Sequence, residues 1–139
     1  MDSPRMSLEL VLLVDDGDLD NFLHQKVIER AQFAKTVVVK TSARSALDYL
    51  CENAKNDQQL PDLILLDINM PGMTGFHFLE EFKSLPDLIR EKCKVMVLSS
   101  SINQGEIARI TNDEHVLQFI DKPLRAYDLT KIQAMFSKS

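Results

Sequence analysis

The sequence has few of the residues that mark specialised folds: no tryptophan, four glycines, five prolines and two cysteines in 139 residues. Cys51 and Cys93 show no C-x-x-C spacing, so we expect two buried free thiols and neither a disulfide nor a cysteine metal site. No run approaches the roughly 18 apolar residues of a membrane span, and the first residues lack the apolar segment of a signal peptide. We therefore expect a cytoplasmic protein that does not contact the membrane.

Basic charge is also scarce, with 16 lysines and arginines against 21 acidic residues and a net charge of −5. A nucleic-acid surface usually needs a basic patch, so we expect no nucleic-acid partner. The 45% hydrophobic content is sufficient for a core, and the length suits one domain. We expect a single domain over residues 1–139, with a core from about 8 to 136 and no output domain.

Short apolar runs alternate along the chain with apolar residues at helical spacing. The continuous runs predict strands that are covered on both faces. The predicted strands span 8–14, 36–39, 63–66, 95–98 and 116–120. The predicted helices carry apolar residues at Leu19, Phe22, Leu23 and Val27; at Ala43, Ala46, Leu47, Leu50 and Ala54; at Gly75, Phe78, Leu79, Phe82 and Leu85; at Ile107 and Ile110; and at Leu129, Ile132, Met135 and Phe136.

Local signals mark several helix ends. Asp18 and Ser42 are expected N-caps, and Pro86 is expected to end the third helix. The helix near Ile102 to Thr111 has the weakest pattern, because Gly105 lies inside it. Strand and helix thus alternate five times, which predicts a parallel sheet with helices on both faces. Right-handed crossovers place the carboxyl ends of the strands at one edge.

Polar side chains follow four of these strands: Asp15 and Asp16, then Asp67, then Ser99, then Lys122. Ligands of α/β sheets bind at this edge. Two like charges about 4 Å apart cost about 4 kcal/mol at an effective dielectric constant of about 20, so such carboxylates need a cation or raised pKa values. Hard oxygen ligands suit Mg²⁺, and the ammonium and hydroxyl can contact phosphate oxygens. Because a carboxylate can also act as a nucleophile, the strand ends predict a site for Mg²⁺ and phosphoryl chemistry.

These residues lie in motifs that make the chain similar to the response-regulator receiver domains of two-component signalling, in particular the stand-alone, chemotaxis-type members. The resemblance covers the chain from about residue 8 to 136. It implies a flavodoxin-like α/β fold of five strand–helix units, with a doubly wound, five-stranded parallel sheet in the order 2-1-3-4-5. The motifs are LVDD at 13–16, LLDINMPGMTG at 65–75, VLSS at 97–100 and FIDKPL at 119–124.

The resemblance also implies a role for each acidic residue. Asp67 would accept a phosphoryl group from a histidine kinase or a histidine phosphotransfer protein. Asp16 would hold Mg²⁺ directly and Asp15 largely through water. Asp67 and the main-chain carbonyl of Asn69 would complete the metal ligands.

Other residues would stabilise the phosphoryl group and transmit its presence. Lys122 would pair with Asp67 and then with the phosphoryl group, and its bond to Pro123 is expected to be cis. Ser99 would be the switch hydroxyl and Phe119 the switch aromatic. A downstream protein would read the face formed by the helix after the fourth strand, the fifth strand and the last helix. The resemblance implies a monomer or a weak phosphorylation-linked dimer that catalyses only its own phosphorylation and dephosphorylation.

Two other functions compete with this one. A phosphatase or phosphotransferase of the haloacid-dehalogenase type would need D-x-D, but 15–17 and 67–69 both lack the second acid. A phosphorylation-independent adaptor could share the fold, although the intact strand-end motifs argue against it. A calcium loop beginning at Asp16 fails, because Asn21 and Val27 occupy the positions that need Gly and Glu.

Several polar residues are interpreted without a functional role. Asp18 and Asp20 suit the start of a helix, where acids cap it or interact with its dipole. His24 has no metal-ligand spacing and is expected at the surface, and Ser101 is expected in a polar loop. The stretch 111–115 lacks the glycine that is common before the fifth strand of the family.

Overall fold

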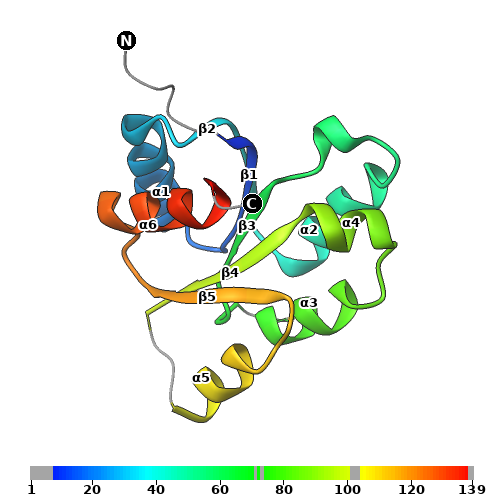
Figure 1. The fold of residues 1–139 in the computed structure, drawn as a ribbon. Helices are drawn as coiled ribbons and strands as arrows, with labels where there is room; N and C mark the ends of the chain where they lie inside the picture. The colour runs from blue at the N-terminus through cyan, green and yellow to red at the C-terminus, as the bar shows by residue number, and fades with distance from the viewer. Residues whose placement is uncertain (1–7, 71, 73, 101–103, 138–139) are drawn as a thin grey trace.

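The computed structural model describes residues 8–70, 72, 74–100 and 104–137. All its strands run parallel in one five-stranded sheet with the order β2-β1-β3-β4-β5 (Figure 1), as predicted. The strands are β1 (Leu8–Val14), β2 (Ala34–Lys40), β3 (Leu63–Leu66), β4 (Lys94–Ser99) and β5 (Val116–Asp121).

Helices cover both faces of the sheet: α1 and α6 lie on one face, and α2, α3, α4 and α5 lie on the other (Figure 1). Among the described residues, none of these helices is long and apolar enough to cross a membrane. The helices are α1 (Asp18–Ala31), α2 (Ala43–Glu52), α3 (Gly75–Phe82), α4 (Asp87–Lys92), α5 (Gln104–Thr111) and α6 (Ala126–Ser137), with a short 3-10 helix at Asp57–Gln59.

The core has two layers because successive strand residues point to opposite faces of the sheet. On β1, Leu12 and Val14 pack beneath α2 and α3, whereas Val11 and Leu13 pack beneath α1 and α6. All four side chains are buried. Burial on both faces explains why the strands appear in the sequence as continuous apolar runs.

Helix α2 follows its sequence pattern closely. Ser42 is its N-cap, and the hydroxyl oxygen accepts a hydrogen bond from the Ser45 N–H at 3.1 Å. Ala46, Leu47 and Leu50 are buried against the sheet. Here the apolar spacing predicted the helix and its buried face, and Ser42 predicted its start.

Helix α1 forms as predicted but turns a different face to the core. Three of the four apolar side chains that predicted it are exposed, at 68% for Leu19, 54% for Phe22 and 44% for Leu23, whereas Val27 is half-buried against the core. Residues on the opposite side of the helix are buried instead, namely Asn21, His24 and Ile28. The expectation that His24 lies at the surface is therefore wrong.

Some helix boundaries differ from the sequence analysis, and one lies outside the described residues. Gly17, and not Asp18, occupies the N-cap of α1. Pro86 follows α3 but is also the N-cap of α4, which was not predicted; a proline suits the start of a helix because the first N–H groups have no partner within it. Helix α5 is described from Gln104, so its predicted start at Ile102 lies outside the described residues, as does Ser101.

The cysteines differ in burial, contrary to expectation. Both are free, but Cys51 is exposed and Cys93 is buried. Burial raises the pKa of the Cys93 thiol to about 12. Cys93 therefore behaves as a small apolar side chain of the core.

The turn before β5 forms without glycine. The Asp113 carboxylate accepts a hydrogen bond from the His115 N–H at 2.9 Å, and the Asp113 carbonyl accepts one from the Val116 N–H at 3.1 Å. Such side-chain capping is the usual reason for aspartate in turns. Among the described residues other than glycine, only Gln32 has a positive φ, so this turn needs no left-handed residue.

Candidate functional site

The site lies at the carboxyl edge of the sheet, which faces the lower left in Figure 1. Strand register places Val14 beside Leu66, so the acids that follow these two residues become neighbours. The Asp67 N–H continues this pairing by donating to the Val14 carbonyl at 2.9 Å. Parallel strands thus bring together residues that lie far apart in the chain.

Three of the predicted carboxylates gather at this edge. One oxygen each from Asp15, Asp16 and Asp67 lies within 4.8 Å of the others, and no other such group is found among the described residues. Asp15 and Asp67 are buried, whereas Asp16 is exposed. The combination of clustered hard oxygen atoms and one solvent-facing acid suits a divalent cation such as Mg²⁺.

Lys122 places the only described ammonium among these acids. Its Nζ lies 2.7 Å from Asp15 Oδ2, 2.7 Å from Asp20 Oδ2 and 3.5 Å from Asp67 Oδ2. Burial disfavours the charged ammonium, but the close contacts with Asp15 and Asp20 and the charge of Asp67 outweigh it and raise the pKa of Lys122. With Asp16 included, one positive charge faces four carboxylates.

Burial dominates the titration of Asp67. It raises the pKa of the Asp67 carboxyl, and the nearby charge of Asp15 acts in the same direction. The Asn69 N–H, which donates to Asp67 Oδ1 at 3.1 Å, and the charge of Lys122 oppose this shift without cancelling it. The ionised carboxylate is therefore held at a free-energy cost that a bound cation would relieve.

Asn69 connects Asp67 to the predicted switch hydroxyl. Its side-chain Nδ2 donates a hydrogen bond to Ser99 Oγ at 3.1 Å, and Ser99 is buried. The predicted switch aromatic, Phe119, is half-buried against the core layer beneath α2, α3 and α5. The Lys122–Pro123 peptide is cis, as predicted.

The loop after Asp67 depends on a glycine at the start of α3. A Cβ atom on Gly75 would lie 2.7 Å from the Ile68 Cα and 2.8 Å from the Asp67 carbonyl oxygen, which no side chain tolerates. The Gly75 N–H also donates to the Ile68 carbonyl at 3.1 Å. Glycine thus lets α3 start directly against the strand end that carries Asp67. Pro71 and Met73 of this motif lie outside the described residues.

Helix α1 contributes residues that the sequence analysis did not assign to the site. Asn21 Nδ2 donates to the Asp15 carbonyl at 2.8 Å, and this bond fixes the helix to the end of β1. Asp20 pairs with Lys122, and the hydrogen bond to Lys122 lowers the pKa of Asp20. Burial, and then the charge of Lys122, lowers the pKa of His24. One feature of the sequence could have assigned Asp20 to the site: it lies in the first turn of a helix that starts two residues after Asp16.

Comparisons with known proteins agree with the fold. Residues 11–134 match the family model described as response regulator receiver domain. A two-component response regulator of Cytophaga hutchinsonii has a crystal structure that superposes with a TM-score of 0.83, at 29% identity over 94% of this chain and 99% of that one. The two folds therefore correspond along almost their whole length.

Two further relatives have names that describe response regulators. Two-component response regulator ORR1 of Oryza sativa is 32% identical over 88% of this chain, which spans about half (53%) of that protein. Response regulator Rcp1 of Synechocystis sp. is 29% identical over 89% of this chain and 83% of that protein. The Mn²⁺-bound form of Rcp1 superposes with a TM-score of 0.69 over 94% of this chain and 93% of that one, at 29% identity.

Proposed function

This chain belongs to the response regulator receiver domain family, and on that premise we propose that Asp67 accepts a phosphoryl group from a histidine kinase or a histidine phosphotransfer protein. The observation that carries the proposal is the setting of Asp67: a buried carboxylate at a strand end, 3.5 Å from the Lys122 ammonium and beside two other acids. The site modifies its own aspartate, so it turns over no external substrate in the manner of an enzyme. On the same premise, we infer that the protein acts in the cytoplasm.

In the transfer, an oxygen of the Asp67 carboxylate attacks the phosphorus atom of the donor phosphohistidine. The new O–P bond forms while the P–N bond breaks, and the imidazole nitrogen leaves with the electron pair. Lys122 and the Ser99 hydroxyl would each contact a phosphoryl oxygen, so that fixed charge and a hydrogen bond stabilise the transition state.

Mg²⁺, when bound, supplies further positive charge to the phosphoryl oxygens. Asp16 would hold it directly and Asp15 largely through water, together with Asp67 and the main-chain carbonyl of Asn69. The carboxylate cluster supports this choice of ion because hard oxygen ligands suit Mg²⁺. Asp16 is the exposed member of the cluster, so water would complete the coordination on that side.

The signal would leave through the face formed by α5, β5 and α6. Phosphorylation would draw Ser99 from Asn69 towards the phosphoryl group and let Phe119 turn inwards, shifting the population between two states. Three side chains at this face are available to a partner protein: Leu117, Tyr127 and Met135 are 42%, 58% and 37% exposed. The activated state would therefore change the surface that a downstream protein binds.

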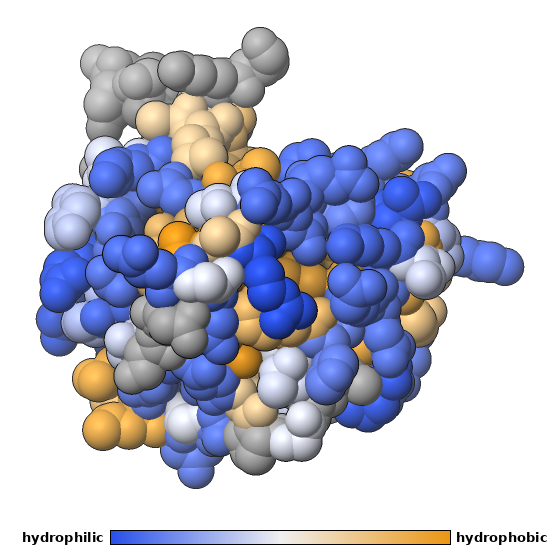
Figure 2. Space-filling model, turned by 90° about the horizontal axis from the view of Figure 1, so that it is seen from below, coloured by the Kyte–Doolittle hydropathy of each residue, from blue (hydrophilic) through white to orange (hydrophobic). Residues whose placement is uncertain are grey.

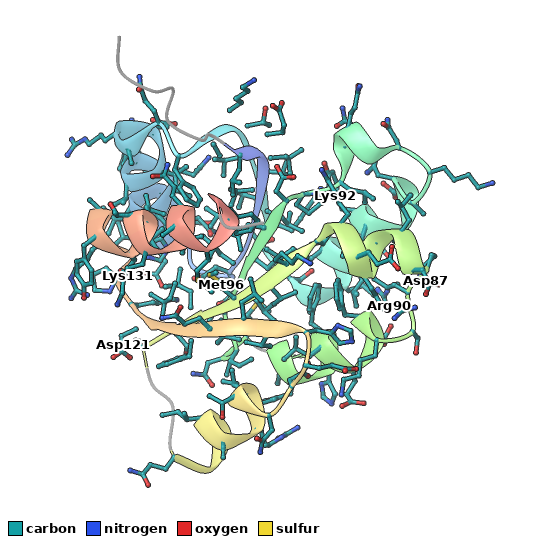
Figure 3. All side chains as sticks on the ribbon, in the orientation of Figure 1. Asp87, Arg90, Lys92, Met96, Asp121 and Lys131 are labelled. Atoms are coloured by element: carbon teal, nitrogen blue, oxygen red, sulfur yellow. The ribbon has the colours of Figure 1, made fainter. Side chains whose placement is uncertain are left out.

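Beryllofluoride with Mg²⁺ tests both parts of the proposal, because it binds an acceptor carboxylate as a phosphoryl analogue. We expect saturable chemical-shift changes in the wild-type protein at the acidic site and along α5, β5 and α6. Asp67→Asn should show neither set. Asp121→Asn is the matched control, since Asp121 is an exposed acid at the end of β5, next to Lys122 (Figure 3).

The two sets of chemical-shift changes test the acceptor residue and the signalling face separately. A wild-type protein that shows no change, or an Asp67→Asn variant that responds like the wild type, rules out Asp67 as the acceptor. Changes confined to the acidic site rule out the proposed signalling face while leaving the acceptor in place.

A further inference from the structure

The Lys122 ammonium lies closer to two other carboxylates than to the carboxylate of Asp67. The ammonium lies 2.7 Å from both Asp15 and Asp20 but 3.5 Å from Asp67. Asp15 and Asp67 follow strands, whereas Asp20 reaches the ammonium from the first turn of α1. Asp20 therefore draws the ammonium to the α1 side of the site.

The exposure of these side chains indicates how strong this contact is. The side chain of Lys122 is only 12% exposed, whereas that of Asp20 is 44% exposed. A fully exposed ion pair contributes little, but a charge-assisted hydrogen bond to a mostly buried ammonium is stronger. The Asp20 contact is thus strong enough to influence where the ammonium lies and weak enough to be exchanged.

We propose that Asp20 is a positioning residue, which holds the Lys122 ammonium against Asp15 and away from Asp67 until a phosphoryl group competes for it. The inference rests on the proposed acceptor role of Asp67. Because the ammonium must then exchange Asp20 for the phosphoryl oxygens, Asp20 lowers the stability of the phosphorylated state. The residue at position 20 would in this way regulate how firmly the site retains a phosphoryl group.

The dissociation constant of beryllofluoride at saturating Mg²⁺ measures this competition. We expect Asp20→Asn to tighten binding about threefold to fivefold, the range of a moderate ion-pair contribution. Asp18→Asn is the matched control, because it removes the same charge from an exposed residue in the same helical turn. It should change binding less than twofold. The difference should persist in about 1 M salt, where the Debye length is about 3 Å and long-range charge effects are screened.

Two further variants separate positioning from a structural effect. Asp20→Glu, which keeps a carboxylate within reach of the ammonium, should restore wild-type affinity. In a Lys122→Gln background, Asp20→Asn should no longer tighten binding, since the residue that it positions is gone. If the asparagine itself perturbs α1, Asp20→Ser should still produce the same tightening.

The inference is overturned if Asp20→Asn and Asp18→Asn bind alike, or if the tightening survives in the Lys122→Gln background. A wild-type protein that binds no beryllofluoride would instead overturn the proposed function, and this inference with it. Wild-type binding without any specific effect of Asp20 leaves the acceptor role of Asp67 intact.

Discussion

Two groups of charged side chains lie at opposite ends of the sheet and differ in how their charges are balanced. At the amino end, Lys92 Nζ lies 2.8 Å from Asp62 Oδ1, and Asp62 Oδ2 accepts hydrogen bonds from the N–H groups of Glu9 at 2.8 Å and Leu10 at 3.3 Å. Figure 3 shows Lys92 at the upper right, far from Asp121 at the carboxyl end of β5. We refer to Asp62 and Lys92 as the amino-end pair.

The carboxyl-end cluster, defined as Asp15, Asp16, Asp20, Asp67 and Lys122, sets four acids against one ammonium. The surface seen from below in Figure 2 is mostly hydrophilic, with hydrophobic atoms at its lower left margin and in smaller areas near its centre and top. Removing one partner of a balanced pair costs stability, whereas an excess of one charge costs stability until a ligand neutralises it. The difference indicates that the amino-end pair is structural and that the carboxyl-end cluster has a composition that suits a cation.

The largest expected effect is that of Mg²⁺ on stability. An ion that binds only the folded state at about 100 times its dissociation constant adds about 2.7 kcal/mol to the free energy of unfolding. We expect this gain in urea denaturation of the wild-type protein and of Asp62→Asn, and a loss of most of it in Asp16→Asn at the same Mg²⁺ concentration. A gain that depends on Asp62 instead of Asp16 would reverse the assignment of the two ends.

Removal of the amino-end acid should have the next largest effect. Asp62→Ala leaves Lys92 without this carboxylate and two backbone N–H groups without their acceptor, at a cost of about 2 kcal/mol in the free energy of unfolding. Both side chains are partly exposed, at 18% and 29%, so we expect less than the cost of breaking a fully buried pair. Asp62→Asn keeps an acceptor oxygen and should lose less. Equal losses in the two variants would show that the backbone contacts contribute nothing.

The two ends also differ in how well the sequence predicted them. Asp15, Asp67 and Lys122 each follow an apolar strand, and parallel topology brings such positions together whatever the details of packing. Asp62 is a single acid before β3, and Lys92 ends α4, a helix that the sequence did not predict. Nothing local in the sequence joins two residues 30 positions apart through such a helix.

Helix α1 shows a second limit of sequence patterns. Its apolar residues predicted the helix correctly, but apolar spacing could not identify the buried face. That face includes Asn21, which donates to the Asp15 carbonyl, and His24, which lies one turn after Asp20. The face of α1 that contacts the end of β1 is therefore the buried one, and Leu19 and Phe22 lie exposed on the other side. Asp20 lies in the same helix, and its contact with Lys122 could be recognised only in the structure.

The smallest expected effect concerns the cost of keeping Asp67 ionised. Burial raises the pKa of Asp67 above its ordinary value of 3.8, so the folded state binds the proton more tightly than the unfolded state does. Stability contributed by this proton is present below pH 3.8 and is lost as the pH rises through the folded-state pKa. Without Mg²⁺, Asp67→Asn should therefore exceed the wild type by about 1 kcal/mol in free energy of unfolding at pH 7, and the difference should vanish towards acid pH.

The comparison with Asp62→Asn, which we expect to be less stable than the wild type at pH 7, sharpens the contrast between the two ends. If Asp67→Asn were also less stable at pH 7, Asp67 would be a balanced structural acid like Asp62, and the excess negative charge would carry no cost for a cation to relieve.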